Sequence, residues 1–145
     1  MTQEEVLDSP TGWVAQHVRE YVETDGEKGH TWRGVSTLLL TTRGRRSGKL
    51  RRTALIYGRD GDRYVIVASQ GGAPKHPQWY LNLRARPEVM VQVGAEKFRA
   101  RARTATPDEK PALWRLMTSI WPAYDDYQKR TEREIPVVLL ERTAD

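Results

Sequence analysis

Short turns join successive strand-like segments of this chain, and they constrain its fold more than any other feature. Residues 35–42 and 51–58 are rich in β-branched and leucine side chains, and Arg59-Asp-Gly-Asp62 is a hairpin turn into a third such segment, 64–69. Parallel strands need long crossovers, usually helical, and strands do not alternate regularly with helices here. The sequence therefore predicts an antiparallel sheet.

A second hairpin and a last apolar segment complete this sheet. Residues 88–93 and 97–103 form a hairpin across Gly94, and 135–141 is an almost continuous apolar strand. In residues 97–103 apolar and basic side chains alternate, so one face of that strand is solvated. Six strands joined mostly by hairpins predict an α+β domain built on a small antiparallel barrel.

Helical patterns flank the sheet at the start, in the middle and late in the chain. Ser9-Pro10 is typical of an N-cap followed by proline at the first helical position. The apolar residues of the helix that follows recur on one face: Val14, Val18, Tyr21 and Val22. A short helix is expected over 78–85. Thr106-Pro-Asp-Glu109 is a capping box for a third helix, and residues 122–130 continue helically after a kink.

Length and composition indicate one globular domain, residues 1–145, in which residues 1–30 form an N-terminal helical extension. Hydrophobic residues make up 38% and charged residues 30% of the chain, so neither disorder nor a fibrous class is indicated. No apolar run approaches the ~20 residues that span a bilayer, and the acidic start does not resemble a signal peptide. Cysteine is absent, which excludes disulfides and thiolate chemistry. We expect a cytoplasmic location.

Motifs for nucleophilic or metal-based catalysis are missing. His17, His30 and His76 have no neighbouring serine or aspartate at a recognisable elbow, and G-x-S-x-G is absent. The sequence also lacks H-E-x-x-H and any spaced pair of histidines on a helix. We therefore expect no metal, and we expect His17 to lie partly exposed on the first helix.

A basic connection joins the first two strands. Six cationic side chains lie between Arg43 and Arg52, and arginine outnumbers lysine five to one. Such a run is usually a solvated loop, or a patch that meets nucleic acid. Arginine, however, suits bidentate contacts with phosphate or carboxylate, and Gly44 and Gly48 let backbone amides approach an anion. The segment is not a Walker loop, because the spacing differs and no helix follows.

A second segment, Ser69-Gln-Gly-Gly-Ala-Pro-Lys-His-Pro-Gln-Trp-Tyr-Leu-Asn82, connects a strand to a helix. Two glycines allow close backbone approach, and a helix N-terminus follows them. This pattern suits the polar edge or phosphate of a flat ring cofactor. The alternative is an ordinary loop whose aromatic residues, Trp79 and Tyr80, belong to the core.

A third segment places aromatic residues three apart, so that Trp121, Tyr124 and Tyr127 share one face of a helical turn. Such a stripe is more often core packing than a substrate pocket.

Together, the three segments resemble the deazaflavin-dependent nitroreductase family of actinobacteria. They match L-L-L-T-T-x-G-R-x-S-G, V-A-S-x-G-G-A-x-K-x-P-x-W-Y-L-N-L and Y-x-x-Y-x-x-x-T-x-R-x-I-P-V-V, between about Trp32 and Arg142. The resemblance implies a split β-barrel that binds coenzyme F-420, an 8-hydroxy-5-deazaflavin with a phospholactate and a polyglutamate tail. That anionic tail would explain the arginine-rich connection.

The family motifs imply roles for individual residues. Phosphate and tail would be held by Arg45, Arg46, Ser47, Gly48 and Arg51. The residues along the ring and ribityl chain would be Ser69, Gln70, Gly71, Gly72, Lys75, Trp79 and Asn82. Trp121, Tyr124 and Tyr127 would line the substrate pocket. Three positions depart from the pattern: Gln70 stands where lysine is common, Ala54 where proline is, and Trp121 where a third tyrosine is.

The implied reaction is hydride transfer from reduced F-420 to a quinone, nitroaromatic or activated enone. A deazaflavin carries the two-electron chemistry itself, so the protein supplies position, electrostatics and a proton donor. Ser69, Tyr124 and Tyr127 are the candidate donors. The dinucleotide fingerprint G-x-G-x-x-G is absent, so direct use of NADPH is not expected.

Two other classes compete with this interpretation. A flavin mononucleotide enzyme on the same barrel would need phosphate contacts but no extended arginine run. A nucleic-acid-binding module would use the basic connection, yet no basic helix or aromatic sheet surface is evident. We expect a small-molecule hydride acceptor and no nucleic acid. Contact with the inner face of the membrane is at most peripheral, because Glu20 and Glu23 lie on the polar side of the first helix.

Overall fold

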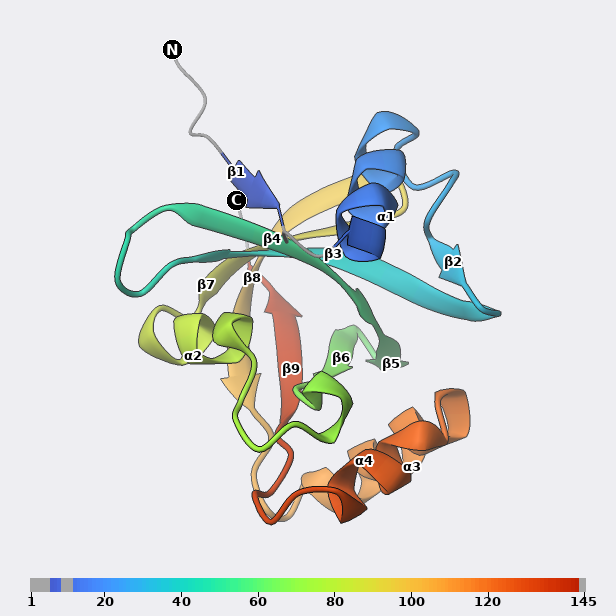
Figure 1. The fold of residues 1–145 in the computed structure, drawn as a ribbon, viewed down its shortest axis with the longest axis vertical. Helices are drawn as coiled ribbons and strands as arrows, with labels where there is room; N and C mark the ends of the chain where they lie inside the picture. Colours follow the sequence, from blue (N-terminus) through green and yellow to red (C-terminus); the bar gives the residue numbers. More distant parts are fainter. Residues whose placement is uncertain (1–5, 9–11, 144–145) are drawn as a thin grey trace.

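The structure is a computed structural model that describes residues 6–8 and 12–143. The elements of Figure 1, in chain order, are β1 (Val6–Asp8), α1 (Gly12–Glu23), β2 (Thr31–Trp32), β3 (Val35–Arg43), β4 (Leu50–Ile56), β5 (Gly58–Asp60), β6 (Arg63–Val67), the 3₁₀ turn η1 (Gln70–Gly72), α2 (Gln78–Ala85), β7 (Glu88–Val93), β8 (Glu96–Thr104), α3 (Lys110–Ile120), α4 (Ala123–Lys129) and β9 (Val137–Arg142).

The strands form a curled sheet in the order β1-β4-β3-β7-β8-β9-β6-β5, and β2 pairs with β3. Every strand pair is antiparallel except β1–β4, which is parallel. The curl brings β4 close to β6 without joining the two in a ladder among the described residues. The result is a half-barrel with four α-helices around it, which confirms the predicted α+β antiparallel split barrel.

The structure also contains strands that the sequence did not reveal. β1, β2 and β5 are two or three residues long, too short to show an alternating pattern. The predicted bounds of α2 and β7 are those observed, and each of the other predicted strands differs by one or two residues at one or both ends. The predicted cap at Ser9-Pro10 lies outside the described residues.

Buried side chains form separate clusters on the two faces of the sheet. Val138 and Leu140 of β9 pack into the barrel interior, where Tyr80 and Leu83 of α2 close one side. The alternate residues of the same strand pack instead against α3 and α4. β9 is therefore buried on both faces, which explains its nearly continuous apolar sequence. In Figure 1, α1 lies on one side of β3 and β4, and α2 lies on the other.

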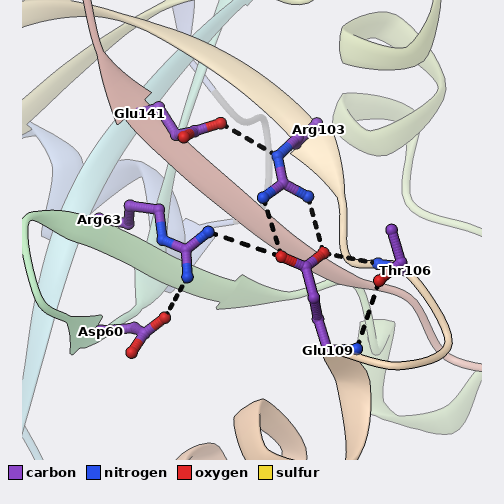
Figure 2. Close-up of polar contacts among 6 residues, drawn as sticks. All are labelled: Asp60, Arg63, Arg103, Thr106, Glu109 and Glu141. Carbon is purple, nitrogen blue, oxygen red and sulfur yellow. Dashed lines mark hydrogen bonds and ion pairs between the residues drawn. The ribbon is translucent and has the colours of Figure 1, made fainter.

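A charged cluster fixes the start of α3 to the sheet (Figure 2). The Glu109 carboxylate accepts hydrogen bonds from two guanidinium nitrogens of Arg103, at 2.7 and 2.9 Å, and from the Thr106 backbone N–H. The Glu109 N–H donates back to the Thr106 hydroxyl, so the predicted capping box is confirmed. Arg103 also donates to Glu141 of β9, and Arg63 of β6 lies 3.6 Å from Glu109. The cluster thus joins α3 to three strands.

Candidate functional site

A cavity of about 980 Å³ lies between α2, α4 and the edge of β4. It brings together residues from all three of the singled-out segments. The predicted site residues that line it are Arg45, Arg46, Ser47, Arg51, Ser69, Gln70, Gly71, Trp79, Asn82, Trp121, Tyr124 and Tyr127. Gly48, Gly72 and Lys75 are not among the lining residues.

The long wall of this cavity is the edge of β4, because consecutive residues from Arg51 to Ile56 all line it. β1 pairs with β4 at residues 50–52. Beyond Arg52, no described strand pairs with this edge. A strand edge without a partner presents backbone N–H and C=O groups in a row. The wall can therefore hydrogen-bond to the polar edge of a flat ring.

One end of the cavity is strongly basic. Arg45, Arg46, Arg51 and Arg52 line it, and none of the lining residues that the structure describes is an aspartate or glutamate. Arg46 and Arg51 are exposed and form no ion pair with any described residue. Several cations over a low-dielectric wall concentrate positive potential. This end suits a phosphate or a carboxylate chain.

The connection that carries Arg45 and Arg46 is a compact turn. The Gly44 N–H donates to the Lys49 carbonyl at 2.7 Å, and the Gly48 N–H donates to the Gly44 carbonyl at 2.9 Å. Gly48 has φ +73°, a conformation that favours glycine, so the turn itself requires this residue. The Ser47 hydroxyl accepts a hydrogen bond from the Lys49 N–H.

Asn82 of α2 holds this turn in place. Its side chain is only 4% exposed. The Asn82 Oδ1 accepts hydrogen bonds from the Arg45 guanidinium at 3.0 Å and from the Arg45 backbone N–H at 3.2 Å. Its Nδ2 donates to the Thr42 hydroxyl at 3.3 Å. The sequence did not indicate this role in orienting Arg45, since the two residues lie 37 positions apart.

The middle of the cavity is formed by the segment 68–77, which we call the Ser69 loop. Gln70, Gly71 and Gly72 have φ values of +45°, +63° and +84°, three left-handed residues in succession. A Cβ on Gly72 would lie 2.6 Å from the Tyr127 carbonyl oxygen, so this glycine is needed where the loop packs against α4. Lys75 is exposed on the loop.

The other end of the cavity is aromatic. The rings of Tyr124 and Tyr127 meet edge to face, with centroids 6.1 Å apart, and the Trp121 indole N–H donates to the Tyr127 hydroxyl at 3.4 Å. Tyr124 is only 5% exposed, and burial, followed by the proximity of Tyr127, raises its pKa well above the usual range. Tyr124 is therefore a neutral hydroxyl at physiological pH.

Two hydroxyls in this cavity, on residues that are otherwise mostly buried, lack partners among the described residues. Neither the Tyr124 hydroxyl nor the Ser69 hydroxyl hydrogen-bonds to any group that the structure describes. No buried side-chain nitrogen or oxygen of the described residues lacks a hydrogen-bond partner, so these two oxygens are accessible from the cavity. Both hydroxyls are thus available to a molecule in the cavity.

The N-terminal part of the chain adds two residues to the cavity wall that the sequence did not identify. His17 of α1 lines it, with its Nε2 2.6 Å from the Gly29 carbonyl oxygen. Trp32 of β2 also lines it, and its ring lies 5.4 Å from that of Trp121. α1, within the predicted N-terminal extension 1–30, thus contributes His17 to the cavity wall.

In the described part of the chain, no group of three or more His, Cys, Asp or Glu side chains could hold a metal ion. Among the same residues, no helix is both long and apolar enough to cross a bilayer.

Comparison with known proteins identifies close relatives. The family model described as "F420H(2)-dependent quinone reductase" matches residues 13–142. An F420H(2)-dependent quinone reductase of Mycobacterium tuberculosis is 42% identical over 143 residues, which cover 90% of this chain and 96% of that protein.

Solved structures agree with this family match. One described as "Structure of F420-H2 Dependent Reductase (FDR-A)" is 40% identical with a TM-score of 0.67, and covers 72% of this chain and 93% of its own. Another, described as a "domain-swapped dimer", is 39% identical with a TM-score of 0.70, and covers 92% of this chain and all of its own. The split-barrel fold is thus shared with these structures.

Proposed function

This chain belongs to the F420H(2)-dependent quinone reductase family, and from that premise we propose how its cavity serves the reaction. It is an oxidoreductase, coenzyme F-420 is its cofactor, and the reduced cofactor passes a hydride to a quinone-type acceptor. The expectation of a deazaflavin-dependent reductase is confirmed, and the flavin mononucleotide and nucleic-acid alternatives lose their support. The assignment of individual residues is our proposal.

One observation carries that assignment: a single cavity has a basic end with no carboxylate among its described lining residues, a strand edge that no described strand pairs with beyond Arg52, and an aromatic end. The shape and charge fit a flat ring with an anionic tail. We assign the phosphate and tail to Arg45, Arg46 and Arg51, because arginine makes charge-assisted bonds to phosphate and carboxylate. Asn82 orients Arg45, and Gly48 shapes the turn.

The ring would be held by the edge of β4 and the Ser69 loop, with Trp79 beside it. The bound deazaflavin supplies the hydride. The aromatic residues Trp121, Tyr124 and Tyr127 would hold the acceptor against the ring and exclude water, since all three line the same end of the cavity. The Tyr124 hydroxyl, or that of Ser69, would donate a hydrogen bond to the oxygen on which negative charge develops.

Binding and turnover test this proposal. Fluorescence titration with oxidised F-420 should give saturable binding at micromolar concentration. In stopped-flow experiments, oxidation of reduced F-420 by menadione should require the protein. NADPH should not replace reduced F-420, because no dinucleotide fingerprint is present. Failure to bind F-420, or comparable turnover with NADPH alone, would refute the proposal.

Location and assembly follow as further proposals. We propose that the enzyme works in the cytoplasm, with at most peripheral contact with the inner face of the membrane. One related structure is described as a domain-swapped dimer. β1, a short N-terminal strand paired at the edge of the sheet, is the type of element that exchanges between subunits.

A further inference from the structure

Arg133, in the segment between α4 and β9, binds the Ser69 loop at four points. Its guanidinium donates to the Ser69 carbonyl at 2.7 Å, the Ala73 carbonyl at 2.8 Å and the Ala68 carbonyl at 3.2 Å. It also lies 3.0 Å from His76 Nδ1, which accepts from it when the imidazole is neutral. Three nitrogens of one side chain therefore fix both ends of a single loop.

The backbone of Arg133 is itself fixed to α4. Gln128, in the last turn of that helix, donates from Nε2 to the Arg133 carbonyl at 2.8 Å. The Gln128 Oε1 accepts from the Ile135 N–H at 2.9 Å, and the Thr131 hydroxyl accepts from the Arg133 N–H at 3.3 Å. The guanidinium thus extends from a segment that cannot shift independently of the helix.

A second contact joins the same two parts of the molecule. Gly72 packs so closely under α4 that an added Cβ would lie 2.6 Å from the Tyr127 carbonyl oxygen and 3.0 Å from the Arg130 Cβ. Loop and helix are therefore connected on both sides of η1. The loop carries Ser69 and Gln70 into the cavity, and the helix carries Tyr124 and Tyr127.

We propose that Arg133 is a positioning residue that couples the Ser69 loop to α4, so that the cofactor side and the acceptor side of the cavity form one rigid unit. The assignment of these two sides rests on the proposed function, but the coupling itself does not. Multiple hydrogen bonds from one planar guanidinium hold a loop with three left-handed residues more firmly than a lysine ammonium, a single point charge, can.

His76 reports on this coupling directly. The charged groups that face its ring are Arg133 on one side and Arg84 of α2 on the other, and the ring of Tyr80 lies 4.9 Å away. Burial, then the charges of Arg133 and Arg84, lower the pKa of His76 below its usual value. Removing Arg133 should raise this pKa towards the usual value, a change that altered global stability alone would not produce.

The test compares Arg133→Ala with Arg130→Ala as the matched control. Arg130 is an exposed arginine three residues earlier that makes one long bond, 3.4 Å, to the Gly71 carbonyl and lies over the Tyr127 ring, 5.5 Å from its centroid, without reaching the Ser69 or Ala73 carbonyls. In Arg133→Ala, amide hydrogen exchange in residues 68–77 should be at least about tenfold faster, while the core strands stay protected. Affinity for oxidised F-420 should fall about tenfold or more, the scale of lost charge-assisted bonds. Arg130→Ala should change either quantity by less than about twofold.

Chemical rescue sharpens the test. Millimolar guanidinium chloride, but not the same concentration of sodium chloride, should restore part of the loop protection and part of the F-420 affinity to Arg133→Ala. Wild-type protection and affinity in Arg133→Ala would overturn the inference, and so would a uniform loss of protection over the whole chain.

Two further outcomes of these experiments also decide the inference. If Arg133→Ala does not fold, Arg133→Lys keeps the charge and the stem, and loop exchange as slow as in the wild type would overturn the inference. If the wild-type protein fails to bind F-420 while Arg133→Ala still loosens the loop and raises the pKa of His76, the proposed function fails and the coupling stands.

Discussion

The arginines of the cavity and those of the cluster in Figure 2 are the same residue type in opposite circumstances. In the cluster, Arg103 donates to the carboxylates of Glu109 and Glu141, and Arg63 pairs with Asp60. At the basic end of the cavity, Arg46 and Arg51 meet no carboxylate of any described residue. The charge of the cluster arginines is neutralised within the protein, whereas Arg46 and Arg51 have no carboxylate partner among the described residues.

This difference shows that the function of a charged side chain is better indicated by the groups around it than by its charge alone. Paired arginines stabilise contacts between elements, and a ligand gains nothing from them. Arginines grouped without carboxylates repel one another, so they destabilise the free protein and favour an anionic ligand. Hydroxyls follow the same rule: Tyr80 is paired with the Thr104 hydroxyl at 2.8 Å, whereas Tyr124 has no partner among the described residues.

The largest expected effect is on turnover, and it distinguishes Tyr124 from Tyr80. Tyr124→Phe keeps the ring and removes only the hydroxyl, so turnover with menadione should fall about 10- to 1000-fold through loss of a transition-state hydrogen bond. Cofactor affinity and Tm should change little. Tyr80→Phe is the matched control, because it removes a buried, paired hydroxyl on α2. It should lower stability by about 1 kcal/mol and leave turnover within about twofold.

Tyr127→Phe and Ser69→Ala remove the other two candidate donor hydroxyls of the cavity. The Tyr127 hydroxyl already accepts a hydrogen bond from Trp121, so its removal should affect turnover less than removal of the Tyr124 hydroxyl. Full turnover in both tyrosine variants, with every acceptor tried, would remove the chemical role of the tyrosines and leave Ser69 as the remaining donor.

The next largest effect is on F-420 affinity, and it distinguishes the cavity arginines Arg45 and Arg51 from Arg103 of the charged cluster. Arg51→Ala or Arg45→Ala should weaken F-420 binding by about 1.5–3 kcal/mol, the scale of a lost charge-assisted hydrogen bond. The Arg51 variant should leave Tm almost unchanged, because its side chain has no described partner to lose. Arg103→Ala should do the reverse, lowering Tm with F-420 affinity retained. Equal affinity in all three variants, measured by fluorescence titration, would return the basic connection to a solvated loop.

Local sequence signals were sufficient for most of the fold. Hairpin turns, the capping box at Thr106 and the apolar face of α1 depend on residues within a few positions of one another, so they could be read from the chain. Most of the residues that line the cavity were also anticipated, since family motifs carried them. The orientation of those residues was not. Arg133 and Ser69 lie 64 positions apart, and Trp32 and Trp121 come from different ends of the chain. Only the tertiary fold brings such pairs together.

The smallest expected effect is on stability, and it concerns Glu109 of the charged cluster in Figure 2. Arg103, then the Thr106 backbone N–H, hold the pKa of this carboxyl well below its ordinary value of 4.5. A carboxyl whose pKa is depressed by folding adds stability that is fully present above its ordinary pKa, and this contribution is lost as the pH falls towards the folded value. Because both side chains stay partly exposed, water and salt screen the pair and the gain is small.

Glu109→Gln should therefore lower Tm slightly at neutral pH, and the difference from the wild type should shrink steadily as the pH is lowered from about 5 to about 3. Thermal unfolding of both proteins across this range measures the difference. Asp108→Asn is the matched control, since Asp108 is exposed in the same turn and forms no ion pair with any described residue. It should not reproduce the trend. A Tm difference for Glu109→Gln that stays constant down to the lowest pH would mean that the carboxylate charge contributes nothing to the contact. The arginine–carboxylate contacts of Figure 2 would then act through hydrogen bonding and packing, and charge neutralisation would no longer distinguish them from the cavity arginines.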